Sequence, residues 1–187
     1  YLIPVRYEEQ EIFEGGTVAA CKHLKSFCKQ VDVRLIGKPV RKVRFLDKLD
    51  NKKLFEVHYD DGHYDNGDLE DGYDAVVVTD FGHERISGEL ITKLCKLPYL
   101  AVATQTNSSN IGFNLITKYR RADYIVIDEP EARLAASDRH GYIHNVMEKL
   151  CHDRAKKFIV THGPYGAYGY EDGYFLHQPA FKKEIMV

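Results

Sequence analysis

Long apolar runs are missing from the 187-residue sequence. No stretch approaches the roughly 18 consecutive apolar residues that indicate a transmembrane helix, so the sequence predicts none. The opening residues, YLIPVRYEEQEIFEGG, contain no basic region followed by an apolar run, and we expect no secretory signal. The sequence therefore predicts a cytoplasmic protein without a membrane partner.

An excess of charge of one sign is also missing. The chain has 26 basic and 28 acidic residues, for a net charge of −2. This balance offers no broad basic surface, so we expect no nucleic-acid partner. With 44% hydrophobic and 29% charged residues, the composition is that of an ordinary globular protein. The length suits one domain, and we expect residues 1–187 to form it.

Metal-binding and disulfide patterns are absent as well. The four cysteines form no C-x-x-C pair, and the nine histidines form no H-E-x-x-H motif. Zinc-ribbon and thioredoxin folds therefore have no support. We expect free thiols at the four cysteines, Cys21, Cys28, Cys95 and Cys151.

The first third of the chain indicates a helix, a strand and a hairpin. Residues 17–30 carry apolar side chains at helical spacing. Residues 31–37 form a short β-branched run that ends in glycine, which predicts a strand. Residues 40–59 alternate apolar and polar side chains on either side of KLDNKK, which predicts an antiparallel hairpin with one covered face.

From residue 75 onward, apolar strands alternate with helical segments. We expect strands over 75–82, 99–106, 122–130 and 156–163, helices over 88–97, 110–119 and 140–154, and a last hairpin over 166–181. Strands that alternate with helices form a parallel sheet with right-handed crossovers. The predicted fold class is therefore α/β with a mostly parallel sheet.

Residues 60–74 are rich in acids and glycine, with seven acids and three glycines. Carboxylates at such close spacing suit a calcium ion, but the EF-hand pattern fails because no glutamate stands at the required offset. A solvated acidic loop explains the same residues. Both interpretations stay open.

Polar residues follow each of the four predicted parallel strands, in the segments 79–83, 104–107, 128–131 and 161–163. Ligands of open parallel sheets bind outside the carboxyl ends of the strands. Four polar strand ends therefore favour a shared binding cleft, although a strand must also leave the core somewhere.

Each of these polar segments also has a structural explanation. Asp128 and Glu131 suit a magnesium ion with bound phosphates, or they are helix-start acids beside Pro130. The glycines from Gly163 to Gly169 form a phosphate-binding turn or a simple turn, and they match neither a Walker A loop nor the dinucleotide fingerprint. Asp80-Phe81-Gly82 matches the DFG of protein kinases, but no other kinase motif accompanies it.

Lys42 and Arg44 stand two residues apart on a predicted strand. Their side chains therefore lie on the same face of that strand. This pair suits a substrate phosphate, and it equally suits two solvated cations on an edge strand.

Taken together, several stretches resemble the ribokinase-like (PfkB) carbohydrate kinase family, most of all its heptose kinase branch. They are EEQEIFEGGTVAACKHLKSF, VRKVRFLDKLDNKKLFEV, YDAVVVTDFGH, LAVATQTNSSNIGFNLITKYRRADYIVIDEPEARLA and FIVTHGPYGAYGY. They follow one another in the family's order over nearly the whole chain. The resemblance implies a three-layer αβα fold, with the 40–59 hairpin as a small lid over the sugar and as a surface for a homodimer.

The resemblance also implies roles for particular residues. It places the substrate beside Gly15, Gly16, Lys42, Arg44 and Asp80. It places the nucleotide phosphates beside Asp128, Glu131, Thr161, Gly163 and Gly166, with Glu131 toward magnesium. The implied cofactors are ATP and Mg²⁺.

Some family features are not found. The catalytic G-A-G-D motif, whose Asp is the family's general base, occurs nowhere in the sequence, so no catalytic residue is assigned. Asp128 replaces the Asn of the family's N-x-x-E motif, and Glu84 stands where the family has Gly. Either the sequence is part of a longer chain, or it is a reduced relative without the catalytic half.

Two functions follow as expectations. The first is an ATP-dependent kinase that transfers a phosphoryl group to a hydroxyl of a sugar or sugar phosphate. The second is a non-catalytic module that binds a sugar or nucleotide. Calcium binding by residues 60–74 is a third and weaker expectation.

Overall fold

The computed structural model describes residues 4–60, 69, 72–152 and 154–181. The chain divides into two compact units, Tyr1–Leu35 and Ile36–Val187. The acidic segment predicted to be a calcium site or a solvated loop falls mostly outside the described residues. The prediction of one domain over residues 1–187 stays a prediction.

The first unit contains one helix, α1 (Gly16–Leu24), with Gly15 as its N-cap. The predicted helix is thus present but ends early, and the chain turns after it. The predicted strand over 31–37 is wrong, because those residues form no regular structure. A strand requires a neighbour for its backbone hydrogen bonds, and a β-branched sequence does not supply one.

The second unit begins with an antiparallel hairpin, β1 (Arg41–Leu46) and β2 (Lys53–Tyr59), which confirms the hairpin predicted over 40–59. The covered face predicted with it is not found, because no residue of either strand is buried. The register pairs Val43 with Val57 and Phe45 with Phe55 on one face. The opposite face pairs Lys42 with His58 and Arg44 with Glu56. The ribbon therefore has one apolar face and one charged face.

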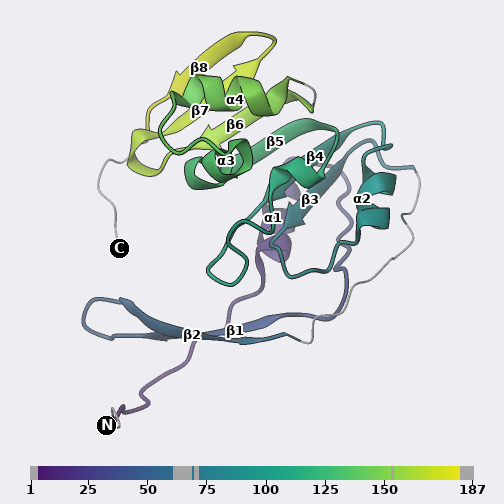
Figure 1. Cartoon of the computed structure of the whole chain (residues 1–187). Coiled ribbons are helices and arrows are strands. Elements are labelled where there is room, and N and C mark those ends of the chain that lie inside the picture. Colours follow the sequence, from purple (N-terminus) through teal and green to yellow (C-terminus); the bar gives the residue numbers. More distant parts are fainter. Residues whose placement is uncertain (1–3, 61–68, 70–71, 153, 182–187) are drawn as a thin grey trace. The chain divides into compact units, whose positions relative to one another are not determined.

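A six-stranded sheet follows in the order β3-β4-β5-β6-β7-β8 (Figure 1). Its strands are β3 (Val76–Asp80), β4 (Leu100–Thr104), β5 (Ala122–Asp128), β6 (Ala155–Thr161), β7 (Ala167–Glu171) and β8 (Tyr174–Gln178). The first four are parallel, and the last two are antiparallel. The predicted α/β fold with a mostly parallel sheet and a separate hairpin is confirmed.

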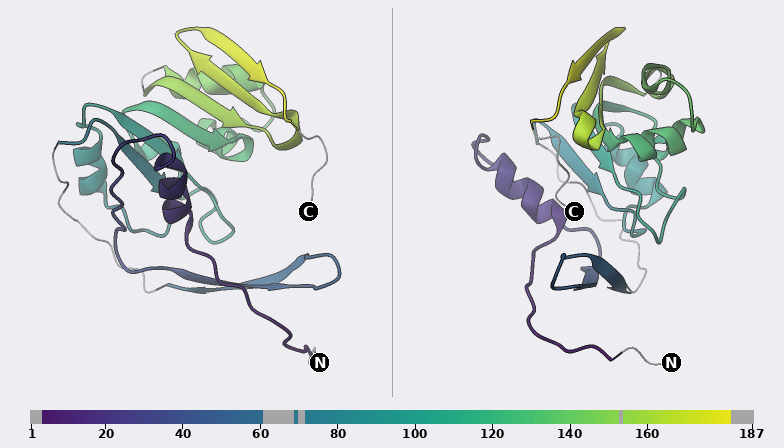
Figure 2. Two further views of the ribbon diagram at one scale, coloured as in Figure 1. Left: turned by 180° about the vertical axis from the view of Figure 1, so that it is seen from behind. Right: turned by 90° about the vertical axis from the view of Figure 1, so that its left-hand side faces the viewer.

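Three helices connect the parallel strands, namely α2 (Gly88–Leu94), α3 (Glu129–Ala136) and α4 (Ile143–Cys151). The strand order advances one position at each crossover, so right-handed connections place all three helices on the same face. In Figure 1, α3 and α4 lie in front of β5 and β6, and the rear view in Figure 2 shows them behind. Their apolar residues share one core with the strands, which includes the fully buried Phe158 and Val160.

The helix predicted over 110–119 is wrong. These residues form turns and one short 3₁₀ helix, η1 (Ile116–Lys118). Two asparagine side chains bond to backbone carbonyls instead: the Asn110 amide donates to Gly82 O at 2.9 Å, and the Asn114 amide donates to Asp80 O at 3.0 Å. Such side-chain bonds compete with helical ones, and Gly112 between them has a φ of +82°.

Two expectations from absent patterns can be compared with the structure. All four cysteines are free, as predicted. No helix among the described residues combines the length and the apolar character needed to cross a membrane.

Candidate functional site

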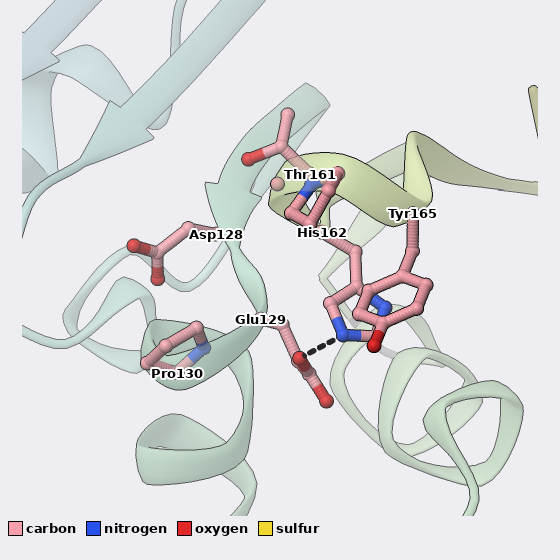
Figure 3. Close-up of a pocket in the computed structure, with 8 residues that line it drawn as sticks. Asp128, Glu129, Pro130, Thr161, His162 and Tyr165 are labelled. Atoms are coloured by element: carbon pink, nitrogen blue, oxygen red, sulfur yellow. Dashed lines mark ion pairs between the residues drawn. The ribbon is translucent and has the colours of Figure 1, made fainter. Parts of the chain in front are cut away.

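The carboxyl ends of β5 and β6 lie side by side, because Asp128 is the register partner of Thr161. The chain enters α3 directly after β5, and it forms a short 3₁₀ helix, η2 (Gly163–Tyr165), after β6. These elements surround a hollow of about 450 Å³ (Figure 3). It is lined by Asp128, Glu129, Pro130, Thr161, His162, Gly163, Pro164 and Tyr165. The hollow is thus at the edge where parallel sheets bind ligands.

Asp128 and Glu131 cap α3 reciprocally, with Pro130 in the first turn. Glu131 also reaches the loop after β4, where the Thr106 N–H donates to Glu131 Oε1 at 2.5 Å. Both Glu131 oxygens therefore accept backbone hydrogen bonds, and the residue is only 7% exposed. Burial raises the pKa of Glu131, and the neighbouring Asp128 carboxylate adds to that rise.

Glu129 connects α3 to the turn after β6. Its Oε2 lies 2.6 Å from His162 Nε2, and its Oε1 accepts a hydrogen bond from Arg133 Nε at 2.8 Å. The His162 ring packs against Tyr165 at a centroid distance of 4.8 Å. In Figure 3, the Glu129–His162 pair and Tyr165 lie on one side of the hollow, and the Asp128 and Thr161 side chains lie on the other side. Glu129 is therefore engaged at both oxygens.

The turn after β6 depends on glycine. Gly166 has a φ of +98°, a region that other residues rarely adopt. A Cβ at this position would collide with the backbone oxygen of Gln178, and it would lie 2.7 Å from the backbone nitrogen of Ala180. The His162 N–H donates to Gly166 O at 2.8 Å and closes the turn. Gly166 therefore has a structural role whether or not a phosphate binds here.

A second hollow of about 360 Å³ lies on the other side of the α3 N-terminus. It is lined by Thr106, Asn107, Ser108, Ile111, Asp128, Pro130, Glu131 and Leu134. Thr106 Oγ1 is buried there without a partner among the described residues. Asp128 borders both hollows, is exposed, and accepts a hydrogen bond only at Oδ1 among the described residues. Its Oδ2 is therefore the carboxylate oxygen most available to a ligand.

Asp80 is buried at the end of β3, with 5% of its surface exposed. Its Oδ1 accepts a hydrogen bond from the Gly82 N–H at 3.1 Å. Its Oδ2 accepts one from the Tyr119 hydroxyl at 2.8 Å and lies 2.6 Å from Lys118 Nζ. The carboxylate is thus fully occupied by groups that hold the chain after β3 and around η1. This arrangement supplies a structural explanation for the Asp80-Phe81-Gly82 stretch.

Lys42 and Arg44 do share one face of β1, but their surroundings differ. Arg44 Nε donates to Glu56 Oε2 at 2.5 Å across the hairpin. Lys42 has no ion pair with any carboxylate in the part of the chain that the structure describes. The hydrogen bond from His58 lowers the pKa of Glu56 to about 2, with a further contribution from Arg44.

The predicted site residues fall into four groups. The residues predicted to bind the nucleotide phosphates lie together at one edge of the sheet. They are Asp128, Glu131, Thr161, Gly163 and Gly166. Lys42 and Arg44 lie together on the hairpin, and Asp80 lies within its own network. Gly15 and Gly16 belong to the first unit, at the start of α1.

Sequence reasoning did not assign roles to several residues that line these sites. His162, Thr106 and Glu129 lie inside the polar strand ends, so their positions were already indicated. Tyr165 carried no signal of its own. The same holds for His58, which becomes the register partner of Lys42 only through the hairpin.

The predicted Mg²⁺ site requires side-chain oxygens that are free to coordinate the ion. Among the described residues, no group of three or more His, Cys, Asp or Glu side chains is arranged to hold a metal ion. Glu131 does not fit as a direct ligand, because both of its oxygens already accept backbone hydrogen bonds. Asp128 fits as a single carboxylate ligand, which is the usual contribution of a protein to magnesium held mainly by phosphates and water.

Comparisons with known proteins give a partial structural likeness. No protein-family model and no curated protein matches the sequence. The fold is similar to a crystal structure of a PfkB protein from Polaromonas sp. JS666, with 16% identity, a TM-score of 0.38, and coverage of 45% of this chain and 30% of that one. A phosphofructokinase-2 mutant from Escherichia coli is also similar, with 13% identity, a TM-score of 0.45, and coverage of 56% and 36%. The chain thus spans about a third of each structure, and the first is named for the family that the sequence resembles.

Proposed function

We propose that this chain carries the phosphate-binding edge and the lid of an ATP-dependent carbohydrate kinase. The observation that supports this most is the placement of Asp128, at the N-terminus of α3, beside the glycine turn after β6. Helix N-termini and glycine turns offer backbone N–H groups to anions. The substrate would be a sugar or sugar phosphate, and the reaction would transfer a phosphoryl group to one of its hydroxyls.

Mg²⁺ would be held by Asp128, through the oxygen that makes no hydrogen bond with described residues. When bound, such an ion neutralises the charge that develops on the transferring phosphoryl group. Glu131 would act indirectly, because it fixes the loop after β4 to the start of α3. In this proposal Glu131 positions Asp128.

The remaining residues of the edge would bind and orient the nucleotide phosphates. Thr161 offers a hydroxyl beside Asp128, and the Gly163 turn offers backbone groups on the same side. Catalysis would then rest on positioning and charge neutralisation. The proposal assigns no general base, because the sequence contains no G-A-G-D motif.

A coupled assay of ADP release tests this function directly. The protein would be incubated with ATP, Mg²⁺ and a panel of free and phosphorylated hexoses and heptoses. Turnover with at least one sugar, reduced at least tenfold in Asp128→Ser, is the expected result. If no sugar on the panel is phosphorylated, the kinase proposal fails.

A non-catalytic binding module is the second candidate. Its support is that the carboxylates of Asp80 and Glu131 are both used for internal hydrogen bonds. A sugar or nucleotide that binds the folded state would raise the melting temperature without ADP release. If no ligand on the panel shifts the melting temperature, this candidate is wrong as well.

A further inference from the structure

The β1–β2 hairpin meets the rest of its unit at a small polar contact. Beyond their pairing with each other, neither strand packs extensively against another helix or strand in the part of the chain that the structure describes. The contact joins Asp60, just after β2, to Arg85, in the loop between β3 and α2. Because so little else attaches the hairpin among the described residues, a change of one charge at this contact can decide whether it holds.

Asp60 has two partners in the loop after β3. The Arg85 guanidinium bonds to Asp60 Oδ1, and His83 Nδ1 lies 3.6 Å from Asp60 Oδ2. Arg85 is only 9% exposed, so its ion pair is largely shielded from water. His58, on β2, meets the His83 ring edge-on at a centroid distance of 6.4 Å. We call these four residues, two from the hairpin and two from the loop, the latch.

Positive charge exceeds negative charge around His83. Two of its neighbours, Lys42 and Arg85, are cations, and Asp60 is the carboxylate beside it. Asp60 is already bonded to Arg85, so it cannot fully offset a further cation. A proton on His83 would therefore place three positive charges beside one carboxylate.

The closed latch disfavours a proton on His83. Burial lowers the pKa of His83, and the Lys42 charge lowers it further, while Asp60 partly opposes them. If the hairpin moved away, the ring would regain the ordinary histidine pKa of about 6.5. The open form therefore binds the proton better. The closed form is favoured at a pH above about 6.5 and is weakened as the pH falls through the lowered pKa.

The other charged groups on this face of the hairpin do not reverse that balance. Arg44 and Glu56 pair with each other, and His58 Nε2 bonds to the same Glu56 carboxylate. A proton on His58 would add to the positive charge that His83 meets. Among the described residues, the charged and titratable groups that face His83 are Lys42, His58, Asp60 and Arg85.

We propose that protonation of His83 releases the β1–β2 hairpin from the loop after β3, so that the latch is closed at pH 8 and open at pH 5. Release breaks the contacts of Asp60 with Arg85 and His83, and it separates the two imidazole rings. The inference concerns the movement of the hairpin alone. It does not depend on the proposed kinase function, and no sugar or nucleotide is needed to test it.

The distance between two spin labels, measured by electron paramagnetic resonance on the full chain, tests the release. One label replaces Leu49, which is 97% exposed at the hairpin tip, and the other replaces Thr92, which is exposed on α2. Cys28 and Cys95, the cysteines that are not buried, are changed to serine so that they take no label. We expect a narrow distance distribution at pH 8 and one at least twice as broad at pH 5. Identical distributions at both pH values would overturn the proposal.

Substitutions of His83 separate its charge from its shape. His83→Gln takes up no proton, so its distribution should stay narrow at pH 5. His83→Lys is charged at both pH values, so its distribution should be broad at both. His144→Gln removes an exposed histidine of α4 and should respond to pH as the wild type does. A pH response that persists in His83→Gln, or one that is lost in His144→Gln, would contradict the assignment to His83.

The contact between the two histidine rings gives a second measurement, on the unlabelled protein. A nuclear Overhauser effect between ring protons of His58 and His83 should be present at pH 8 and absent at pH 5. Asp60→Asn removes the carboxylate that joins the two sides, so it should open the latch already at pH 8. If Asp60→Asn keeps both the ring contact and the narrow distance distribution at pH 8, these residues do not hold the hairpin and the proposal is wrong.

Discussion

Asp128 and Glu131 cap each other at the start of α3. The Glu131 N–H donates to Asp128 Oδ1 at 2.8 Å, and the Asp128 N–H donates to Glu131 Oε2 at 3.0 Å. The exchange occupies Glu131 completely once Thr106 is included, but it occupies only one oxygen of Asp128. The sequence supports the same interpretations for Asp128 and Glu131, but the structure leaves only Asp128 with a carboxylate oxygen free of hydrogen bonds to described residues.

Substitution of Asp128 by Ser separates ligand binding from capping. Ser is as good an N-cap as Asp and keeps one oxygen acceptor, but it removes the second oxygen, so stability should change by less than about 1 kcal/mol. The affinity for Mn²⁺ in the presence of ATP, measured by electron paramagnetic resonance, should fall at least tenfold. Asp138→Ser is the control, because Asp138 also accepts backbone N–H bonds but lies outside both hollows. Unchanged Mn²⁺ affinity in Asp128→Ser would contradict the role given to Asp128.

The stability of the sheet should depend on the ionised form of Asp123. Burial of Asp123 favours a higher pKa, but the Leu100 N–H, at 2.9 Å, and the Arg121 guanidinium outweigh it and lower the pKa. A carboxyl whose pKa is lower in the folded state stabilises it above the unfolded pKa and loses that effect as the pH falls. Urea unfolding should therefore show stability decreasing below about pH 4.

Asp123→Asn should reduce the loss of stability at acidic pH. At pH 7 it should lower the free energy of unfolding by about 1–3 kcal/mol, because a buried charged hydrogen-bond acceptor is lost. Asp74→Asn removes an exposed carboxyl instead and serves as the control. If the free energy of unfolding decreases equally with falling pH in wild type and Asp123→Asn, other groups cause the decrease.

Gly166→Ala should disrupt the turn beside the larger hollow. The new Cβ would meet the backbone at the end of β8, which cannot move aside as a flexible side chain would. We expect a loss of more than about 1 kcal/mol in urea unfolding. In Gly169→Ala, the added Cβ would meet its nearest neighbour only at 3.8 Å, so this matched variant should cost less. Equal stability of the two variants would contradict the steric argument.

The apolar face of the hairpin should support a homodimer. Phe45 and Phe55 stack at a centroid distance of 4.3 Å, yet they are 41% and 50% exposed. Two-stranded ribbons are marginally stable in water, and burial of this face would stabilise one. Sedimentation equilibrium should show a dimer that Phe45→Ser weakens at least tenfold. A monomer at the highest concentration tested would count against this prediction.

Much of the fold was predictable from local pattern. The runs that became β3, β5 and β6 are apolar and end in polar residues, and the spacing from Asp128 through Pro130 to Glu131 indicated a helix start. The two failures share a physical cause. Residues 31–37 have strand propensity without a strand to pair with, and residues 110–119 have helical spacing that asparagine side chains override.

The sequence by itself determined most of the strands and helices, the parallel direction of the sheet, and the alternating faces of the hairpin. Only the tertiary structure decided which charged side chains are paired within the protein and which can still contact a ligand. Lys42 and Arg44 are equivalent in the sequence pattern, yet Glu56 faces Arg44 across the hairpin and leaves Lys42 unpaired within the described residues. Glu131 and Asp128 differ for the same reason. Periodicity is a property of neighbouring residues, whereas the pairing of a charge depends on groups that the fold brings from elsewhere in the chain.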